Sequence, residues 1–166
     1  MRYLPYDAFT LDTDLAPGVV VERLRAVVEP YRVFRFGGYS KPFQGYVEPD
    51  EFAFSRVIEY RNSFLPRITG RIVARANGTT LDVRVAMHPF VTVFLIVWLS
   101  GVTIAFLVTC VVAVQRHETA WTMLIPLGML LFGYGLAMGG FWSEARGTPR
   151  TIQAILNDAP RKASAG

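Results

Sequence analysis

Cysteine, histidine and the short motifs of familiar enzymes are scarce or missing in this chain. Its 166 residues include one cysteine and two histidines, so no disulfide can close within the chain. It contains no glycine-rich phosphate loop, no nucleophile elbow of a hydrolase and no paired-histidine zinc motif. We therefore predict no catalytic, cofactor-binding or metal-binding residues, and a protein that is not an enzyme is the favoured interpretation.

Charge is missing from two long segments. Residues 89–114 and 121–142 contain no Asp, Glu, Lys or Arg. Each exceeds the roughly 20 apolar residues that a helix needs to cross a bilayer, and a helix satisfies its own backbone hydrogen bonds there. We predict a transmembrane helical hairpin over residues 89–142, with an outer loop at 115–120. Because both spans lack ionisable side chains, a transporter or pump is disfavoured.

The distribution of basic residues predicts the orientation of this hairpin. Of 17 Lys and Arg residues, 12 precede residue 89, one lies between the spans and four follow residue 142. Basic residues collect on the cytoplasmic side of membrane proteins. Both termini are therefore expected in the cytoplasm, at the plasma membrane. The net charge of +4 includes no basic cluster with interleaved aromatic residues, which argues against a nucleic-acid partner.

Residues 1–88 have the pattern of a cytoplasmic α+β domain. Apolar residues at helical spacing predict one short helix over about residues 15–28. Alternating runs broken by Gly, Pro and Asn predict strands at 31–36, 43–48, 51–60, 67–75 and 79–87. This succession is typical of an antiparallel β-meander. After the hairpin, residues 143–166 are predicted as a cytoplasmic tail in which Pro149 begins a short amphipathic helix.

Asn77-Gly78 is the strongest local signal for a hairpin turn, because both residues tolerate the left-handed backbone of a two-residue turn. A turn centred there pairs Ile72 with Val83 and gathers apolar side chains on one face of the two strands. The opposite face then collects Arg67, Arg71, Arg75 and Arg84. We expect this second face to be basic.

The segment at residues 61–66 reads Arg-Asn-Ser-Phe-Leu-Pro and places two large apolar residues in a turn. The predicted register brings this turn to the membrane surface. Two interpretations stay open: Phe64 and Leu65 fill the core of a structural corner, which is favoured, or they form a wedge that contacts lipid. The residues predicted to contact lipid or a partner are Arg61, Phe64, Leu65, Arg67, Arg71 and Arg84.

Small residues recur four positions apart in both apolar segments. Gly101 and Ala105 form such a pair in the first, and Gly135 and Gly139 form one in the second. Pairs of this kind allow two helices to approach closely. Packing of the hairpin on itself is the favoured interpretation, and a homodimer interface is the alternative.

Two stretches resemble a group of uncharacterised bacterial two-span membrane proteins. One is the Tyr-Arg-Asn-Ser-Phe-Leu-Pro-x-Ile-x-Gly run at residues 60–70, and the other is the Gly-Thr hairpin followed by His88 just before the first span. The likeness covers roughly residues 43–98. The chain departs from the group where Arg-Val-Ala-Met precedes His88. The resemblance implies this architecture and a bacterial plasma membrane, and it implies no activity.

These observations predict an α+β membrane protein with three parts: a cytoplasmic domain, a helical hairpin and a short C-terminal helix. The expected function is that of a non-enzymatic anchored module. Its basic sheet would face a partner protein or the anionic headgroups of the lipid bilayer. The alternative is an enzyme or a transport-complex subunit that acts on a membrane substrate. A buried polar pocket between the sheet and the spans would favour the alternative.

Overall fold

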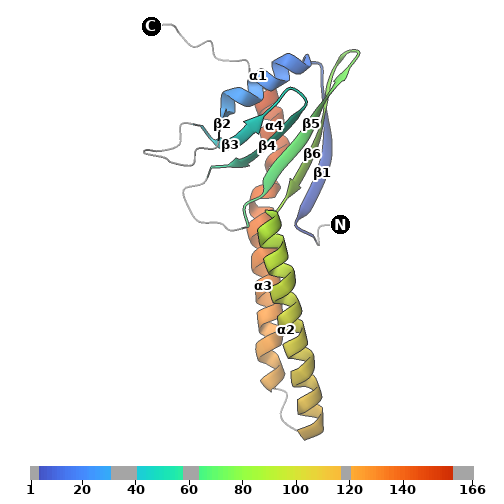
Figure 1. Cartoon of the computed structure of the whole chain (residues 1–166), viewed down its shortest axis with the longest axis vertical. Helices are drawn as coiled ribbons and strands as arrows, with labels where there is room; N and C mark the ends of the chain where they lie inside the picture. The colour runs from blue at the N-terminus through green and yellow to red at the C-terminus, as the bar shows by residue number, and fades with distance from the viewer. Residues whose placement is uncertain (1–3, 31–40, 58–63, 117–120, 159–166) are drawn as a thin grey trace.

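A computed structural model describes residues 4–30, 41–57, 64–116 and 121–158 of the chain. Within them, a mixed sheet stands above two long helices (Figure 1). The strands are β1 (Tyr6–Thr13), β2 (Val28–Glu29), β3 (Phe43–Val47), β4 (Glu51–Arg56), β5 (Arg67–Arg75) and β6 (Gly78–Ala86). The helices are α1 (Pro17–Val27), α2 (Pro89–Arg116), α3 (Trp121–Ala145) and α4 (Thr148–Asn157). The predicted α+β class is confirmed.

The sheet has the strand order β1-β6-β5-β4-β3-β2. Strands β3 to β6 form the predicted antiparallel meander, but β2 runs parallel to β3, so the sheet is mixed. The prediction of a purely antiparallel sheet is therefore wrong. It also missed β1, which pairs with β6 over its full length. The strand predicted at 31–36 lies outside the described residues.

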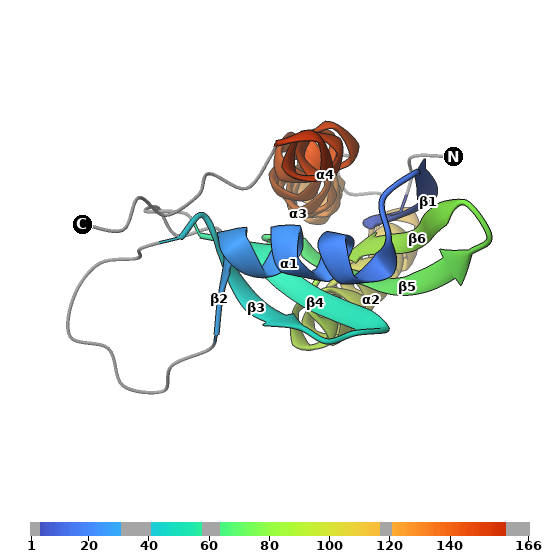
Figure 2. The ribbon, with the colours of Figure 1, turned by 90° about the horizontal axis from the view of Figure 1, so that it is seen from above.

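One face of the sheet is covered by α1 and α4, which lie on the same side of it (Figure 2). Helix α1 buries Val20 and Leu24 against the sheet, and α4 buries Ile152 and Leu156. Three phenylalanine rings pack beneath them, with Phe54 stacked on Phe52 and edge-on to Phe43. Burial of apolar surface in this layer provides the main favourable free energy of folding for the domain.

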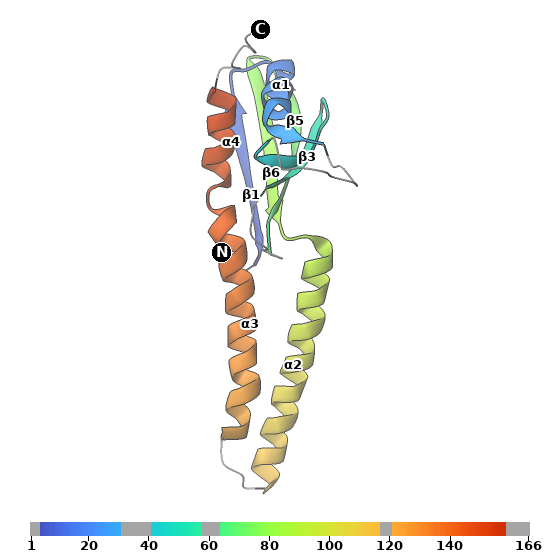
Figure 3. The ribbon, with the colours of Figure 1, turned by 90° about the vertical axis from the view of Figure 1, so that its left-hand side faces the viewer.

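Helix α4 is fixed to α1 by a polar contact as well as by apolar packing. The Arg23 guanidinium donates a hydrogen bond to the backbone carbonyl of Leu156 in the last turn of α4. The negative C-terminal end of the α4 dipole also stabilises the positive charge of Arg23 at that position. Pro149 stands in the first turn of α4, as the sequence predicts. Helix α4 continues upward from α3, and the two helices run along the covered side of the sheet (Figure 3).

Helices α2 and α3 pack side by side below the sheet (Figure 3). Both are long and apolar enough to cross a membrane. In the most apolar 18-residue stretch of α2, no residue is buried within the protein. In the corresponding stretch of the second apolar helix, 11% of the residues are buried. The indole of Trp98 on α2 lies against Gly133 on α3, where a Cβ would collide with the ring. That glycine is one of the points at which the two helices approach.

The β5–β6 pairing differs from the predicted register by two residues. Ile72 lies opposite Leu81 rather than Val83, and Arg71 lies opposite Asp82. The predicted register would have placed Arg71 opposite Arg84, a like-charge pair that destabilises a sheet. A shift of two residues preserves the faces, because side chains alternate with a period of two. Gly78 has the predicted positive φ, at +127°.

Candidate functional site

The second face of the sheet carries the residues that sequence analysis placed with the arginines. We call it the open face, because α1 and α4 pack only on the other side (Figure 2). From β1 to β3 its side chains come from Tyr6, Ala8, Thr10, Asp12, Thr80, Asp82, Arg84, Ala86, Arg67, Thr69, Arg71, Val73, Arg75, Glu51, Ala53, Ser55, Gln44 and Tyr46. Four of these are arginines and three are acidic, so the face that was predicted to be basic also carries carboxylates.

Charge on the open face changes along the strands. The cross-strand row nearest to α2 contains Arg67 between Ala86 and Ser55, and no acidic residue. The next row contains Arg84 with Ala8, Thr69, Ala53 and Tyr46, again without an acid. The third row contains Asp82, Arg71 and Glu51. The α2 end is therefore positive, and the first acidic side chains stand one strand step beyond Arg84.

At the far end the opposite charges are paired. Arg75 forms an ion pair with Asp12 at 2.7 Å, and the hydroxyl of Thr80 donates a hydrogen bond of 2.7 Å to the same carboxylate. The Thr80 hydroxyl and then the Arg75 guanidinium hold the pKa of Asp12 below its ordinary value. Both partners in the ion pair are more than half exposed, so water screens much of their attraction. Because its guanidinium is paired with Asp12, Arg75 is not a free cation.

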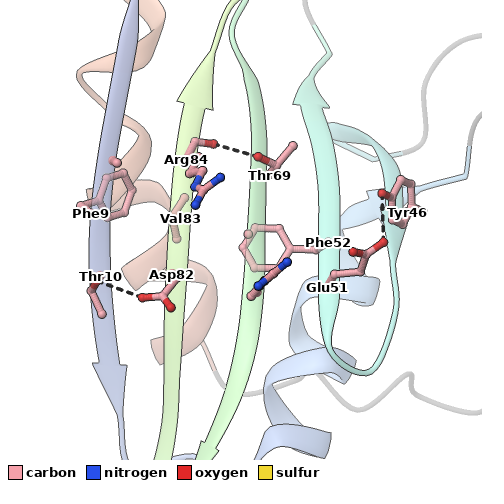
Figure 4. A pocket seen from close by; sticks show the side chains of 12 residues that line it. Phe9, Thr10, Tyr46, Glu51, Phe52, Thr69, Asp82, Val83 and Arg84 are labelled. Atoms are coloured by element: carbon pink, nitrogen blue, oxygen red, sulfur yellow. Dashed lines mark hydrogen bonds between the residues drawn. The ribbon is translucent and has the colours of Figure 1, made fainter.

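A hollow of about 530 Å³ opens over the middle of this face, bordered by Tyr46, Glu51, Asp82 and Arg84 (Figure 4). Its floor is low because small side chains, Ala8 and Thr69, lie between the longer ones. The Tyr46 hydroxyl donates a hydrogen bond of 3.3 Å to Glu51. Partial desolvation and the Glu51 carboxylate raise the pKa of Tyr46. The hollow therefore offers both cationic and anionic groups within the volume of a small-molecule site.

The other three arginines of the open face differ from Arg75 in their partners, and two of them, Arg71 and Arg84, line the hollow. Among the described residues, Arg67, Arg71 and Arg84 make no ion pair within 4.0 Å. The Nε of Arg67 is buried and has no hydrogen-bond partner. Asp82 accepts a hydrogen bond of 3.0 Å from the Thr10 hydroxyl. A free guanidinium has five donors in a planar fork, which suits the oxygens of a phosphate or a carboxylate.

The Phe-Leu pair at residues 64–65 belongs to a packed corner. Phe64 is half-buried and packs against the core cluster that contains Phe141 and Trp142, and Leu65 is half-buried as well. Phe64 therefore fits the favoured interpretation, in which the segment is a structural corner that fills the core. Of the residues predicted to contact lipid or a partner, Arg67, Arg71 and Arg84 share the open face, and Phe64 lies among the core residues. Arg61 lies outside the described residues.

The small-residue pairs face outward. A Cβ added at Gly101, Gly135 or Gly139 would meet no heavy atom within 4 Å, and Ala105 is exposed. Neither pair lies where α2 meets α3, so the favoured prediction that they pack the hairpin on itself is wrong. Gly133, which does meet the partner helix, lies outside the predicted pairs. The spacing of small residues predicts that a helix has a face of small side chains, but it does not predict whether that face contacts the partner helix.

A small cavity lies at the junction between the sheet and α3. Its volume is about 40 Å³, close to that of one water molecule, and it lies beside Arg56 and Glu144. Those two residues form an ion pair at 3.3 Å that ties β4 to α3. Among the described residues, no three His, Cys, Asp or Glu side chains gather as a metal site would require. No family model, curated protein or solved structure matches this chain.

Proposed function

We propose that this protein is a non-enzymatic membrane-anchored module. Helices α2 and α3 would span the inner membrane of a bacterium, with both termini in the cytoplasm. The open face would then stand beside the inner membrane surface, where it would receive a protein partner or lipid headgroups. Homodimerisation within the membrane, through the outward-facing small residues, is compatible with this arrangement.

The observation that carries the proposal is a contrast in apolar exposure within one chain. The face of the sheet that α1 and α4 cover buries its apolar side chains, with Phe54 and Leu81 both at 0% exposure. The hairpin does the opposite, since large apolar residues such as Phe132 at 71% and Ile125 at 71% point away from the protein. A continuous apolar surface of this extent is not stable in water, and lipid is the solvent that suits it.

Among the described residues, the cavities favour a module over an enzyme or a transport-complex subunit. A substrate site between the sheet and the spans would need a polar cavity at that junction. The cavity observed beside Arg56 and Glu144 is too small for an organic substrate. The larger hollow lies on the exposed sheet surface, where a headgroup or a peptide can reach it. A surface of this kind supports recognition more readily than water-excluded catalysis.

Cysteine labelling in intact cells tests both the insertion and the orientation. Gln115→Cys, in a Cys110→Ala background, marks the exposed end of α2 that the proposal places outside the cell. Asp50→Cys marks the turn between β3 and β4 in the cytoplasm. An impermeant thiol reagent should modify Gln115→Cys alone and should reach Asp50→Cys only after lysis. Labelling of Asp50→Cys in intact cells would reverse the orientation, and release of the protein by alkaline carbonate would disprove the anchoring.

A further inference from the structure

The outer edge of β1 presents backbone groups that no neighbouring strand of the described sheet uses. Strand β1 has 8 residues and pairs without a bulge with β6, on one side only. The strand at the opposite edge, β2, has 2 residues. Long regular edges readily accept a further strand, and proteins usually protect them with proline, lysine, a bulge or a covering element. Strand β1 contains no proline, lysine or arginine, so its edge lacks the first two of these devices.

Alternation along β1 identifies the residues whose backbone groups point outward. In an antiparallel strand, every second residue exchanges its N–H and C=O with the paired strand, and the residues between point the other way. The N–H of Ala8 donates a hydrogen bond of 3.1 Å to the Asp7 carboxylate, so Ala8 faces away from β6. The outward residues are therefore Tyr6, Ala8, Thr10 and Asp12. Within the described ranges, no other hydrogen bond reaches the outward backbone groups of these four residues.

Apolar surface accompanies this free edge. The side chains of Phe9 and Leu11 point to the covered face and pack against the core cluster, yet both are only half-buried. Figure 2 shows β1 at the end of the sheet, where a further strand would lie next to these two side chains. Apolar cross-strand neighbours stabilise a sheet. An incoming segment therefore needs apolar side chains at alternate positions, on the face that Phe9 and Leu11 share.

The charges of β1 add a second requirement. The strand has two carboxylates, Asp7 and Asp12, and no cation. Asp12 is already paired with Arg75, whereas Asp7 makes no ion pair with any described residue. Arg84 lies opposite Ala8, on the other face of the sheet from Asp7. When an incoming carbonyl replaces Asp7 as the acceptor for the Ala8 N–H, the released carboxylate can pair with a lysine or arginine of the new strand.

We propose that β1 receives an extended segment of a partner protein by strand addition, with alternate apolar side chains beside Phe9 and Leu11 and a basic side chain beside Asp7. The outward N–H and C=O groups provide affinity for any extended backbone, and the side chains beside the segment provide specificity. The segment runs antiparallel to β1, because antiparallel pairing is slightly more stable per residue. This edge is a different surface from the open face of the proposed module.

A second copy of the chain does not fit the edge when both copies are anchored. Strand β1 runs nearly along the helical hairpin (Figures 1 and 3). Antiparallel pairing of two β1 strands would therefore point the two hairpins in opposite directions, away from a shared bilayer. A two-fold axis along the hairpins would instead bring each N–H opposite the same N–H of the other copy. The choice of a different protein as the partner thus rests on the proposed anchoring.

The test measures binding of labelled synthetic peptides to the full chain in a neutral detergent by fluorescence anisotropy. The probe is Thr-Val-Thr-Val-Thr-Lys-Thr, which in antiparallel pairing sets valine beside Leu11 and Phe9 and lysine beside Asp7. The wild type should bind this probe several-fold more tightly than the peptide with glutamate in place of lysine. Asp7→Ala should bind the two peptides equally.

Thr10→Pro tests the edge itself, because it deletes one outward N–H and leaves the bonds to β6 in place. It should lower the affinity for the probe about tenfold. Thr10→Ala is the matched control, since it loses the same hydroxyl bond to Asp82 but keeps the N–H, and it should bind as the wild type does. The bound probe should also slow amide hydrogen exchange over residues 6–13. Protection elsewhere, or equal affinities of Thr10→Pro and Thr10→Ala, would overturn the inference.

Two further measurements cover a misfolded variant and a second copy. If Thr10→Pro does not resist protease as the wild type does, a probe with two adjacent prolines at its centre decides, and undiminished binding of that peptide overturns the inference. In membranes, Thr10→Cys in a Cys110→Ala background should not oxidise to a linked dimer, and a dimer would make the partner a second copy. The peptide assay in detergent does not depend on membrane insertion, so a protein that binds the probe but is released by alkaline carbonate has the edge site without the anchoring.

Discussion

The sheet and the helical hairpin use apolar side chains in opposite ways. In the sheet most of them point to one layer that α1 and α4 cover, and Phe54 in that layer has no exposed surface. In the hairpin they point outward, and Phe132 is 71% exposed. The same residue type therefore serves internal packing in one region and contact with the surroundings in the other. High hydrophobicity alone therefore does not identify a protein core, because an apolar side chain belongs to the core only if it points toward other parts of the protein.

Truncation of phenylalanine should sharpen this comparison most strongly. Phe54→Ala removes a ring that contacts Phe43 and Phe52, and should lower the free energy of unfolding of the sheet by about 3–5 kcal/mol. Phe132→Ala removes the same ring from the hairpin surface and should leave the sheet unchanged. Urea-dependent proteolysis of the full chain in detergent measures both. Equal effects would show that the two regions do not differ in packing.

A charge inserted into the helical hairpin should have the next largest effect, and this effect is on membrane insertion. Leu131→Arg places a cation near the middle of the second apolar segment, at a side chain that is 67% exposed. Its insertion should cost about 2.5–3.5 kcal/mol. Val73→Arg adds the same charge on the open face, where the side chain meets water. The measurement is the fraction of protein in the membrane pellet, which should fall for Leu131→Arg only.

Glycine substitutions provide a third comparison, with a smaller effect. Gly78 has a φ of +127°, and a Cβ there would collide with the backbone carbonyl of Thr13. Gly78→Val should destabilise the sheet by roughly 1–2 kcal/mol, and a protease should cut it at lower urea. Gly135→Ala meets no neighbouring atom in the hairpin and serves as the control. An unaffected sheet in Gly78→Val would argue against the positive φ of Gly78 and its close approach to Thr13.

The weakest expected effect is a pH dependence at the far end of the open face. Because the pKa of Asp12 is lowered in the folded state, its contribution is present above its unfolded pKa of about 3.9. It is lost as the pH falls through the folded value. Arg75→Ala should thus be less stable than the wild type at neutral pH, and the two should converge in acid. A difference that persists at pH 2 would assign the effect to packing rather than to the ion pair.

Local patterns in the sequence determined the parts of this protein that depend on side-chain periodicity and composition. Strand β5 occupies the predicted residues 67–75, and α2 begins at the predicted Pro89. The faces of β5 and β6 also follow from the alternation, since even a register error of two residues preserves them. The two apolar helices follow from length and composition alone. These properties repeat within a few residues, so a single segment is enough to reveal them.

Tertiary structure alone decided which segments distant in the sequence became neighbours. Strand β1 is stabilised by pairing with β6, some 70 residues later, and it brings Asp12 to Arg75. This pairing and the two-residue shift that sets Asp82 opposite Arg71 turn a face predicted to be basic into one that is positive only near α2. Which glycine meets a partner helix was likewise decided by the rotation of α2 against α3. Charge complementarity and close packing act between residues distant in sequence, so no local pattern contains them.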